Sequence, residues 1–272
     1  MARRKGVLVG ALVALGLLAG GSVAQAAERQ CVGAIGPETV RGDLVVPPGA
    51  TCDLAGTRVR GSVYVREEAE LVAEQAEVRG SIEAERDAFV DLVETSVGGT
   101  LALRNTFAAF VEGGSIAGNL ESRGDRFLVL AFASIGGNVK VADGTASVFG
   151  DGLEVNGTLE AVEPGFFDLF DSTVNGNFYA RGTLGGSFFC GNTLNGNAEL
   201  TDTHGLLVIG STSSSCDGNH LNGSLEVHRN EADIEISDND VGGNLACFDN
   251  APPPAGGGNR VHGNREGQCA AL

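Results

Sequence analysis

The segment "RVRGSVYV" at residues 58–65 returns nineteen residues later as "EVRGSIEA" at residues 77–84. Both stretches carry an aliphatic residue, a spacer, a glycine, a small polar residue and then alternating apolar and polar residues. The glycine recurs twelve times, at spacings of 19 or 20 residues with one of 27, as Gly42, Gly61, Gly80, Gly99, Gly118, Gly137, Gly157, Gly176, Gly196, Gly223, Gly243 and Gly263. An aliphatic residue precedes each glycine by two positions, and an apolar residue follows it by two in every unit but the last, which has Arg265. A fixed short period of this kind is the signature of a repeat protein.

The length and composition of the unit predict its fold. Nineteen residues are too few for two amphipathic helices, whereas β-branched residues, alternation and glycines indicate strands and turns. Nineteen extended residues cover roughly 60 Å, which suits one lap of a small triangular coil with three short strands. We therefore expect an all-β, single-stranded parallel β-helix (β-solenoid), right-handed, with about 12 coils of 19–20 residues. The second strand of each coil is expected about ten residues after the motif, for example at residues 90–93 and 127–130.

The residue types of the motif fit such a coil. Aliphatic side chains stack inside, and the glycine marks a corner where a side chain would clash or where φ must be positive. The Asp, Ser, Thr or Asn after each glycine can bond to neighbouring turns along the stack. The thirteen phenylalanines are interpreted as internal stacks between coils, because a sugar-binding platform would be expected to use tyrosine and tryptophan.

The six cysteines provide a test of the coil prediction. Residues that stack in adjacent coils are about one period apart, and Cys31 and Cys52 are separated by 21 residues, Cys247 and Cys269 by 22. Cys190 and Cys216 are 26 apart, but this pair crosses the 27-residue unit, whose extra residues lie around "STSSSCDG", Ser211–Gly218. The period thus predicts three disulfides between sequential cysteines, Cys31–Cys52, Cys190–Cys216 and Cys247–Cys269.

Both ends of the chain depart from the repeat. Residues 1–26 combine a basic start, an apolar run from Val7 to Leu18 and the small-x-small sequence Ala24-Gln25-Ala26, the pattern of a cleaved secretory signal peptide. The apolar run is shorter than the roughly 20 residues that span a bilayer. We expect an N-terminal cap at residues 27–39, the β-solenoid at 40–246, and a last coil with a disulfide-closed cap at 247–272, where Pro252, Pro253 and Pro254 oppose ladder pairing.

The net charge of the chain narrows the classes of partner that it is expected to bind. The formal net charge of −17 becomes −20 once the three basic residues of the signal segment are removed. Such a surface repels nucleic acid and anionic lipid, so we expect neither nucleic acid nor, after signal cleavage, a membrane as partner. Export through a secretory signal predicts a secreted, extracellular or cell-envelope location, where disulfides persist.

The sequence contains no specific catalytic pattern. The four histidines lie in different units without ligand spacing, and no metalloprotease, nucleotide-binding or serine-hydrolase motif is present. We therefore predict no enzyme activity, no cofactor and no metal. Arg41, Arg60 and Arg79 occupy one position in three successive coils and form a candidate contact row for an anion or polysaccharide, although Glu38 and Glu77 lie close enough to neutralise two of them. A second row, Glu83, Glu121, Glu160, Glu199, Glu226 and Glu266, is interpreted as a solvated strand face.

The recurring "V-x-G-[NS]-[LIV]-x-[AV]", as in "VRGSVYV", "IAGNLES", "IGGNVKV" and "VNGNFYA", resembles the repeat of bactofilins, the polymer-forming bacterial cytoskeletal proteins. The resemblance covers about residues 38–265 and implies a right-handed parallel β-helix that assembles end to end. This chain departs from the family in its signal peptide and its six cysteines, since bactofilins are typically cytoplasmic and lack disulfides.

Two functions follow as hypotheses. The first is an exported, non-enzymatic β-solenoid with a structural, cell-surface or assembly role, whose partner is a second copy, end to end or laterally. The alternative is a β-helix that binds or degrades polysaccharide of the cell envelope. The insertion at Ser211–Gly218 is one of the places where the repeat breaks, and the sequence assigns it no function.

Overall fold

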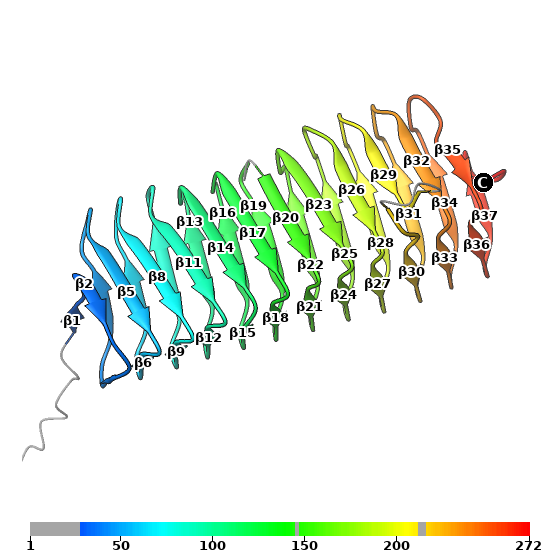
Figure 1. The fold of residues 1–272 in the computed structure, drawn as a ribbon. Helices are drawn as coiled ribbons and strands as arrows, with labels where there is room; N and C mark the ends of the chain where they lie inside the picture. The colour runs from blue at the N-terminus through cyan, green and yellow to red at the C-terminus, as the bar shows by residue number, and fades with distance from the viewer. Residues whose placement is uncertain (1–27, 145–146, 212–215) are drawn as a thin grey trace, which may run out of the picture.

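A computed structural model of the chain describes residues 28–144, 147–211 and 216–272. The expected signal peptide at residues 1–26 lies outside these residues, as does part of the insertion after Ser211. Every strand of the described part pairs in parallel with the equivalent strand of the next coil, in three sheets. The coils line up side by side into a rod from the N-terminal end to the C-terminal end (Figure 1). The predicted all-β parallel solenoid of about 12 turns is confirmed.

Sheet A is formed by the strand that follows the corner glycine in each coil, and it runs along one side of the rod. It has thirteen strands of two to four residues in the described chain. They are β1 (Arg29–Gln30), β4 (Leu44–Val46), β7 (Val63–Val65), β10 (Ile82–Glu85), β13 (Leu101–Arg104), β16 (Leu120–Arg123), β19 (Val139–Ala142), β22 (Leu159–Val162), β25 (Phe178–Arg181), β28 (Ala198–Thr201), β31 (Leu225–His228), β34 (Leu245–Phe248) and β37 (Arg265–Gly267).

Sheet B contains the second strand of each coil and most of the longest strands. The twelve strands described are β2 (Gly33–Ile35), β5 (Thr51–Ala55), β8 (Glu70–Glu74), β11 (Phe89–Val93), β14 (Ala108–Glu112), β17 (Phe127–Ala131), β20 (Ser147–Asp151), β23 (Phe166–Phe170), β26 (Ser187–Cys190), β29 (Leu207–Ile209), β32 (Ile234–Ser237) and β35 (Ala255–Gly257).

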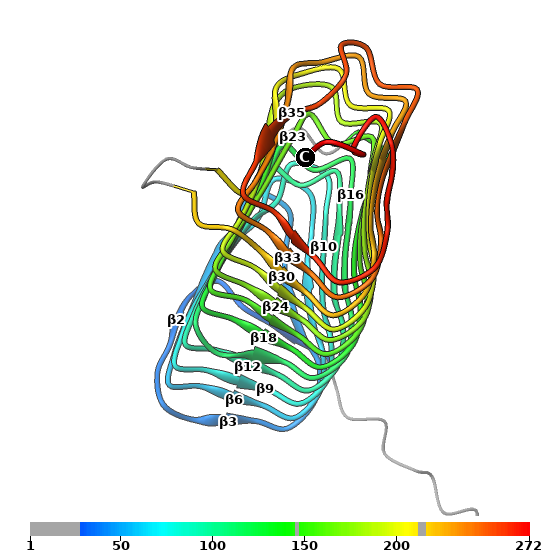
Figure 2. The same ribbon diagram turned by 90° about the vertical axis from the view of Figure 1, so that its right-hand side faces the viewer.

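Sheet C is made of two-residue strands that lead into the corner glycine. The twelve strands described are β3 (Thr39–Val40), β6 (Arg58–Val59), β9 (Glu77–Val78), β12 (Ser96–Val97), β15 (Ser115–Ile116), β18 (Ser134–Ile135), β21 (Glu154–Val155), β24 (Thr173–Val174), β27 (Thr193–Leu194), β30 (His220–Leu221), β33 (Asp240–Val241) and β36 (Arg260–Val261). Successive coils follow almost the same outline (Figure 2).

The core is a continuous column of aliphatic side chains inside the three sheets. Val59, Val63 and Leu71 of one coil are fully buried, and their equivalents in the following coils are buried as well, except in the last coil, where Val261 is partly buried and Arg265 is exposed. Burial alternates along the strands, as in β8, where Leu71 and Ala73 point inward. Period-two alternation therefore decides which side chains reach the core.

The corner glycines stand between sheets C and A because the backbones of adjacent coils approach closely there. A Cβ atom placed on Gly80 would lie 2.7 Å from the carbonyl oxygen of Gly61, and the amide of Gly80 donates to that oxygen at 2.9 Å. The corner does not require positive φ, so of the two reasons expected for the glycine, the clash is the one that holds. Positive φ is used instead directly after sheet B strands, by residues such as Gln75 and Gly113.

The polar residue after each glycine bonds to the next coil. The amide of Ser81 donates to Ser62 Oγ at 3.1 Å, and the amide of Asn138 donates to Asn119 Oδ1 at 2.9 Å. Deeper in the molecule, buried asparagines form a second ladder, in which Asn192 donates to Asn219 and Asn219 to Asn239, at 3.0 and 2.9 Å. These ladders satisfy polar groups that the turns would otherwise leave unpaired.

The structure forms the disulfides Cys31–Cys52, Cys190–Cys216 and Cys247–Cys269, the three pairs that the period selects. They close separations of 21, 26 and 22 residues, one near each end of the rod and one beside the insertion.

The prolines behave differently from expectation. Residues 252–254 lie between β34 and β35, and β35 still pairs with β32, so the ladders continue into the last coil. The prolines fall in the connection between two sheets, where no ladder amide is needed.

Replacing a mid-rod corner glycine should destabilise the protein. In Gly118→Ala the new methyl group would meet the Gly99 carbonyl oxygen at 2.7 Å, so we expect a loss of roughly 1–3 kcal/mol, as for other overpacked sites. Thermal and urea unfolding would measure it. Gly36→Ala, where the methyl group meets no atom within 4 Å, is the control, and equal losses in the two variants would contradict the packing explanation.

Removing the first disulfide should loosen the N-terminal coil. We expect Cys31→Ala with Cys52→Ala to cost roughly 3 kcal/mol in the chain-entropy model and to speed amide exchange in β1, β2 and β5. Hydrogen–deuterium exchange would localise the change. The paired control is Cys190→Ala with Cys216→Ala, which should leave exchange in those strands unaltered.

Candidate functional site

The arginine row lies at the corner that follows the sheet C strands β3, β6 and β9, at the N-terminal end of the rod. Arg41, Arg60 and Arg79 each precede a corner glycine, and all three side chains are exposed. Among the ion pairs of the described residues, Glu77 binds both Arg79 and Arg58, at 3.4 and 3.3 Å. The expectation for Glu38 was wrong, because this carboxylate binds Arg29 on β1 instead.

The residue that directly precedes the corner glycine changes type toward the C-terminal end of the rod. It passes from the arginines through Gly98, Ala117 and Gly136 to the exposed asparagines Asn156, Asn175, Asn195 and Asn222. These asparagine side chains bond to one another from coil to coil, for example Asn195 to Asn175 at 2.7 Å. The row of three arginines is thus the N-terminal end of a column that continues with small residues and stacked asparagines and ends with His262, so the arginines do not repeat along the rod.

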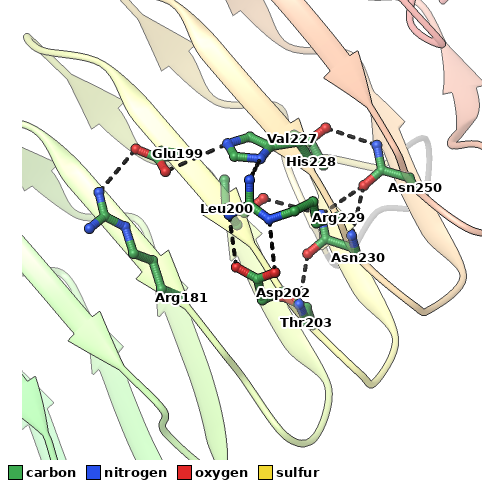
Figure 3. Close-up of polar contacts among 10 residues, drawn as sticks. All are labelled: Arg181, Glu199, Leu200, Asp202, Thr203, Val227, His228, Arg229, Asn230 and Asn250. Carbon is green, nitrogen blue, oxygen red and sulfur yellow. Dashed lines mark hydrogen bonds and ion pairs between the residues drawn. The ribbon is translucent and has the colours of Figure 1, made fainter.

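The glutamate row lies on the outer face of sheet A, as expected for a solvated strand face. Several of its members pair with cations of neighbouring coils, including Glu160 with Lys140 at 3.4 Å. Figure 3 shows the densest part, where Glu199 contacts Arg181 at 3.1 Å and His228 at 3.6 Å. These pairs link three successive coils.

A second ion pair extends this network. Arg229 binds Asp202 through two nitrogens at 3.1 and 3.0 Å, and also contacts His228 Nδ1 at 2.7 Å (Figure 3). The hydrogen bond from Arg229 holds the pKa of Asp202 below its usual range. All charges here have partners, so the network stabilises coil stacking and leaves no free acid or base.

The four histidines lie in different units of the sequence. The stacking of coils nevertheless brings two of them to one carboxylate. His220 and His262 both contact Asp240, at 3.6 and 2.9 Å. Across the described residues, however, no group of three or more His, Cys, Asp or Glu side chains has the geometry to hold a metal ion.

The most unusual surface is the outer face of sheet B. The interior assignment of the phenylalanines was wrong for most of them, because only Phe167, Phe178 and Phe189 are buried. Seven others point outward from strands β11 to β26 and define what we term the acidic-aromatic face, together with the carboxylates between them; they are Phe89, Phe110, Phe127, Phe149, Phe166, Phe170 and Phe188. Rings of adjacent coils contact one another, with centroids 5.7 Å apart for Phe89 and Phe110 and for Phe149 and Phe170.

The charge of this face has one sign. The described strands of sheet B contain eight carboxylates and no lysine, arginine or histidine. The carboxylates are Asp53, Glu70, Glu74, Asp91, Glu112, Asp151, Asp168 and Glu235. Sheets A and C, by contrast, mix both signs on their outer faces.

Two aspartates lie in shallow hollows of the acidic-aromatic face. A hollow of about 340 Å³ is lined by Phe89, Asp91 and Phe110, and another of about 460 Å³ by Phe149, Asp168 and Phe188. Asp91 and Asp168 belong to one outward column, four ladder steps apart. Each hollow therefore pairs aromatic rings with a carboxylate at the same register position.

Both carboxylates are perturbed by their surroundings. Burial raises the pKa of Asp91, and the neighbouring charges of Glu112 and Glu70 raise it further. Burial also raises the pKa of Asp168, opposed by the amide of Phe188, which donates to Asp168 Oδ1 at 3.0 Å. Within the described residues neither aspartate forms an ion pair, so their negative charges lack a cationic partner.

The sequence carried a signal for this face that the first interpretation missed. In "FFDLF" at residues 166–170, Asp168 shares its parity with Phe166 and Phe170, whereas Phe167 shares the opposite, inward parity with Leu169. Because a charged residue marks the solvent side of a strand, parity assigns Phe166 and Phe170 to the outside.

The fold and these surfaces define the chain as an all-β parallel solenoid with disulfide-linked coils. No protein-family model, curated protein or solved structure matches it. Within the described parts of the chain, no helix has the length and apolar character required to cross a membrane.

Removing the half-buried charge of Asp168 from the acidic-aromatic face should stabilise the fold. The raised pKa of Asp168 means that its protonated form favours folding, and that this contribution is lost as the pH rises through the raised value. Asp168→Asn keeps an acceptor for the Phe188 amide but cannot ionise. We expect its melting temperature to exceed that of the parent by about 1–3 °C at neutral pH, and the gain to vanish below about pH 4, near the ordinary pKa of aspartate.

Thermal unfolding across pH 3–8 would measure this effect. The matched control is Asp53→Asn, an exposed carboxylate in the same column. A gain of the same size in both variants, or a gain in Asp168→Asn that does not change with pH, would contradict burial as the cause.

Proposed function

We propose that this protein is an exported, non-enzymatic β-solenoid with a structural or assembly role at the cell surface or in an extracellular matrix. The observation that carries the proposal is the unbroken stack of coils, paired in three sheets and joined by disulfides near both ends. Three disulfides with no free cysteine in the described chain suit an oxidising, extracellular environment. The signal-like residues 1–26 support the same location.

The mechanical basis of this role is the rod itself. Twelve coils at a spacing of about 4.8 Å give a rod roughly 50 Å long, with a core that runs through its whole length. The coils at the two ends present strands with one paired edge only, since β3 pairs with β6 and β36 with β33. Free strand edges can template pairing with another chain, which makes end-to-end assembly the physical route suggested by the bactofilin-like repeat.

The last coil also carries a closing turn. Residues 269–272 fold back through hydrogen bonds of Cys269 and Leu272, and Leu272 packs against the core. Assembly through this end would have to accommodate the turn. The acidic net charge further opposes lateral association of two copies.

Light scattering after size exclusion, together with negative-stain microscopy of the protein without residues 1–26, tests the proposal. We expect filaments that lengthen with protein concentration. A globular domain fused after Leu272, at the C-terminal end of the rod (Figure 1), should block filament growth if contact is end to end. A discrete monomer at every concentration that is retained on a glycan array would overturn the assembly role and favour the alternative, polysaccharide binding.

A further inference from the structure

The acidic-aromatic face of sheet B leaves more aromatic surface exposed than the ring contacts between adjacent coils explain. Its phenylalanines are between about one third and one half exposed at Phe110, Phe127, Phe149, Phe166 and Phe188, with values from 36% to 53%. Stacking needs apolar residues inside the coil, not on its outer surface, and sheets A and C are folded equally well without such a row. Exposed apolar patches of this kind mark interaction surfaces.

The charges of the face specify the partner. Every charged side chain on the described strands of sheet B is a carboxylate, and Asp91 is crowded by Glu70 and Glu112. A second copy of this face would bring like charges together, and a neutral chain would leave the carboxylates without partners. A partner with cationic groups avoids the repulsion between like charges and also pairs with the carboxylates.

One phenylalanine ring beside the face already contacts a cation in this molecule. At the border of the face, the guanidinium of Arg126 lies 5.6 Å from the centroid of the Phe107 ring and binds Asp87 at 3.2 Å. This arrangement combines an aromatic ring, a carboxylate and an arginine. The hollows at Asp91 and Asp168 present the ring and the carboxylate without the arginine.

The distance between the two hollows determines how long an extended ligand must be to occupy both. Four ladder steps separate Asp91 from Asp168, a distance of about 19 Å along the rod. An extended polypeptide covers this distance in about six residues. Between the two aspartates the column contains Phe110, Val129 and Phe149, which offer an apolar floor.

We propose that the acidic-aromatic face binds an extended basic segment of a partner protein, which lies along the rod axis with one cationic side chain at Asp91, another at Asp168, and apolar side chains over Phe110, Val129 and Phe149. Recognition is through side chains, because the backbone groups of sheet B are already paired between coils. This binding function goes beyond the proposed structural role and does not depend on self-assembly.

A synthetic peptide tests the proposal directly. The probe contains Arg-Ser-Leu-Ser-Leu-Ser-Arg, in which the two arginines are six residues apart and the leucines share their side of an extended chain, and it carries a fluorophore. A control peptide of identical composition has its two arginines adjacent. We expect fluorescence anisotropy to show binding of the first peptide to the full mature chain, and binding at least about fivefold weaker for the second.

Variants of the face provide the second arm. Asp91→Asn with Asp168→Asn, and separately Phe149→Thr, should each weaken binding of the spaced peptide by about tenfold, through loss of ion pairing or of ring contact. The matched controls on sheet A, Glu226→Gln and Phe248→Thr, should leave it unchanged. Circular dichroism and thermal unfolding would verify that each variant is folded.

Three results would overturn the proposal. Equal affinity for the two peptides would show attraction by net charge alone. Equal loss in the sheet A controls would show that no defined face is used. Binding of a second copy or of a neutral glycan that Phe149→Thr abolishes, without binding of the spaced peptide, would assign the face to a different partner.

Discussion

The close approach of neighbouring backbones at the corner between sheets C and A governs the rest of the structure. The amide of each corner glycine donates to the carbonyl of the glycine one coil earlier, and no side chain fits in the space between them. This contact locks each coil in register with the next, so that aliphatic side chains meet their equivalents inside the rod. Because each coil contacts mainly its two neighbours, the fold is a sum of such interfaces.

The register between coils then fixes which side chains lie together on the outer face of each sheet. The three outer faces differ in their charges and in their aromatic rings. On sheets A and C, charges of both signs alternate between coils and largely neutralise one another, as in the network of Arg181, Glu199 and His228. On sheet B the outward columns collect rings and carboxylates without a base. A solenoid can hold such an unbalanced face because most of its stability comes from the interior column and the ladders, so an outer side chain such as Asp168 lowers it only slightly.

The sequence correctly predicted the features that depend on the repeat period. It failed for features that depend on whether a residue within a strand points inward or outward. The twelve glycines predicted the fold class, the coil number and the stacking of Cys190 with Cys216 across the insertion. The phenylalanines were assigned to the core on hydrophobicity alone, although Phe166 and Phe170 share the parity of Asp168. Glu38 was assigned to the arginine row, but its actual partner is Arg29 on β1, the first strand of the described chain.

What the sequence by itself determined is the repeat: units of nineteen or twenty residues, each with a corner glycine, stack on one another, and stacking aligns equivalent residues one coil apart. What only the tertiary structure decided is which residues of different coils meet on each outer face. Asp91 and Asp168 are far apart in the chain, yet the ladders place them in one column with Phe110 and Phe149 between them. The physical reason is that the period aligns coils along the rod, whereas the inward or outward direction of each side chain depends on how the strand sits against the core.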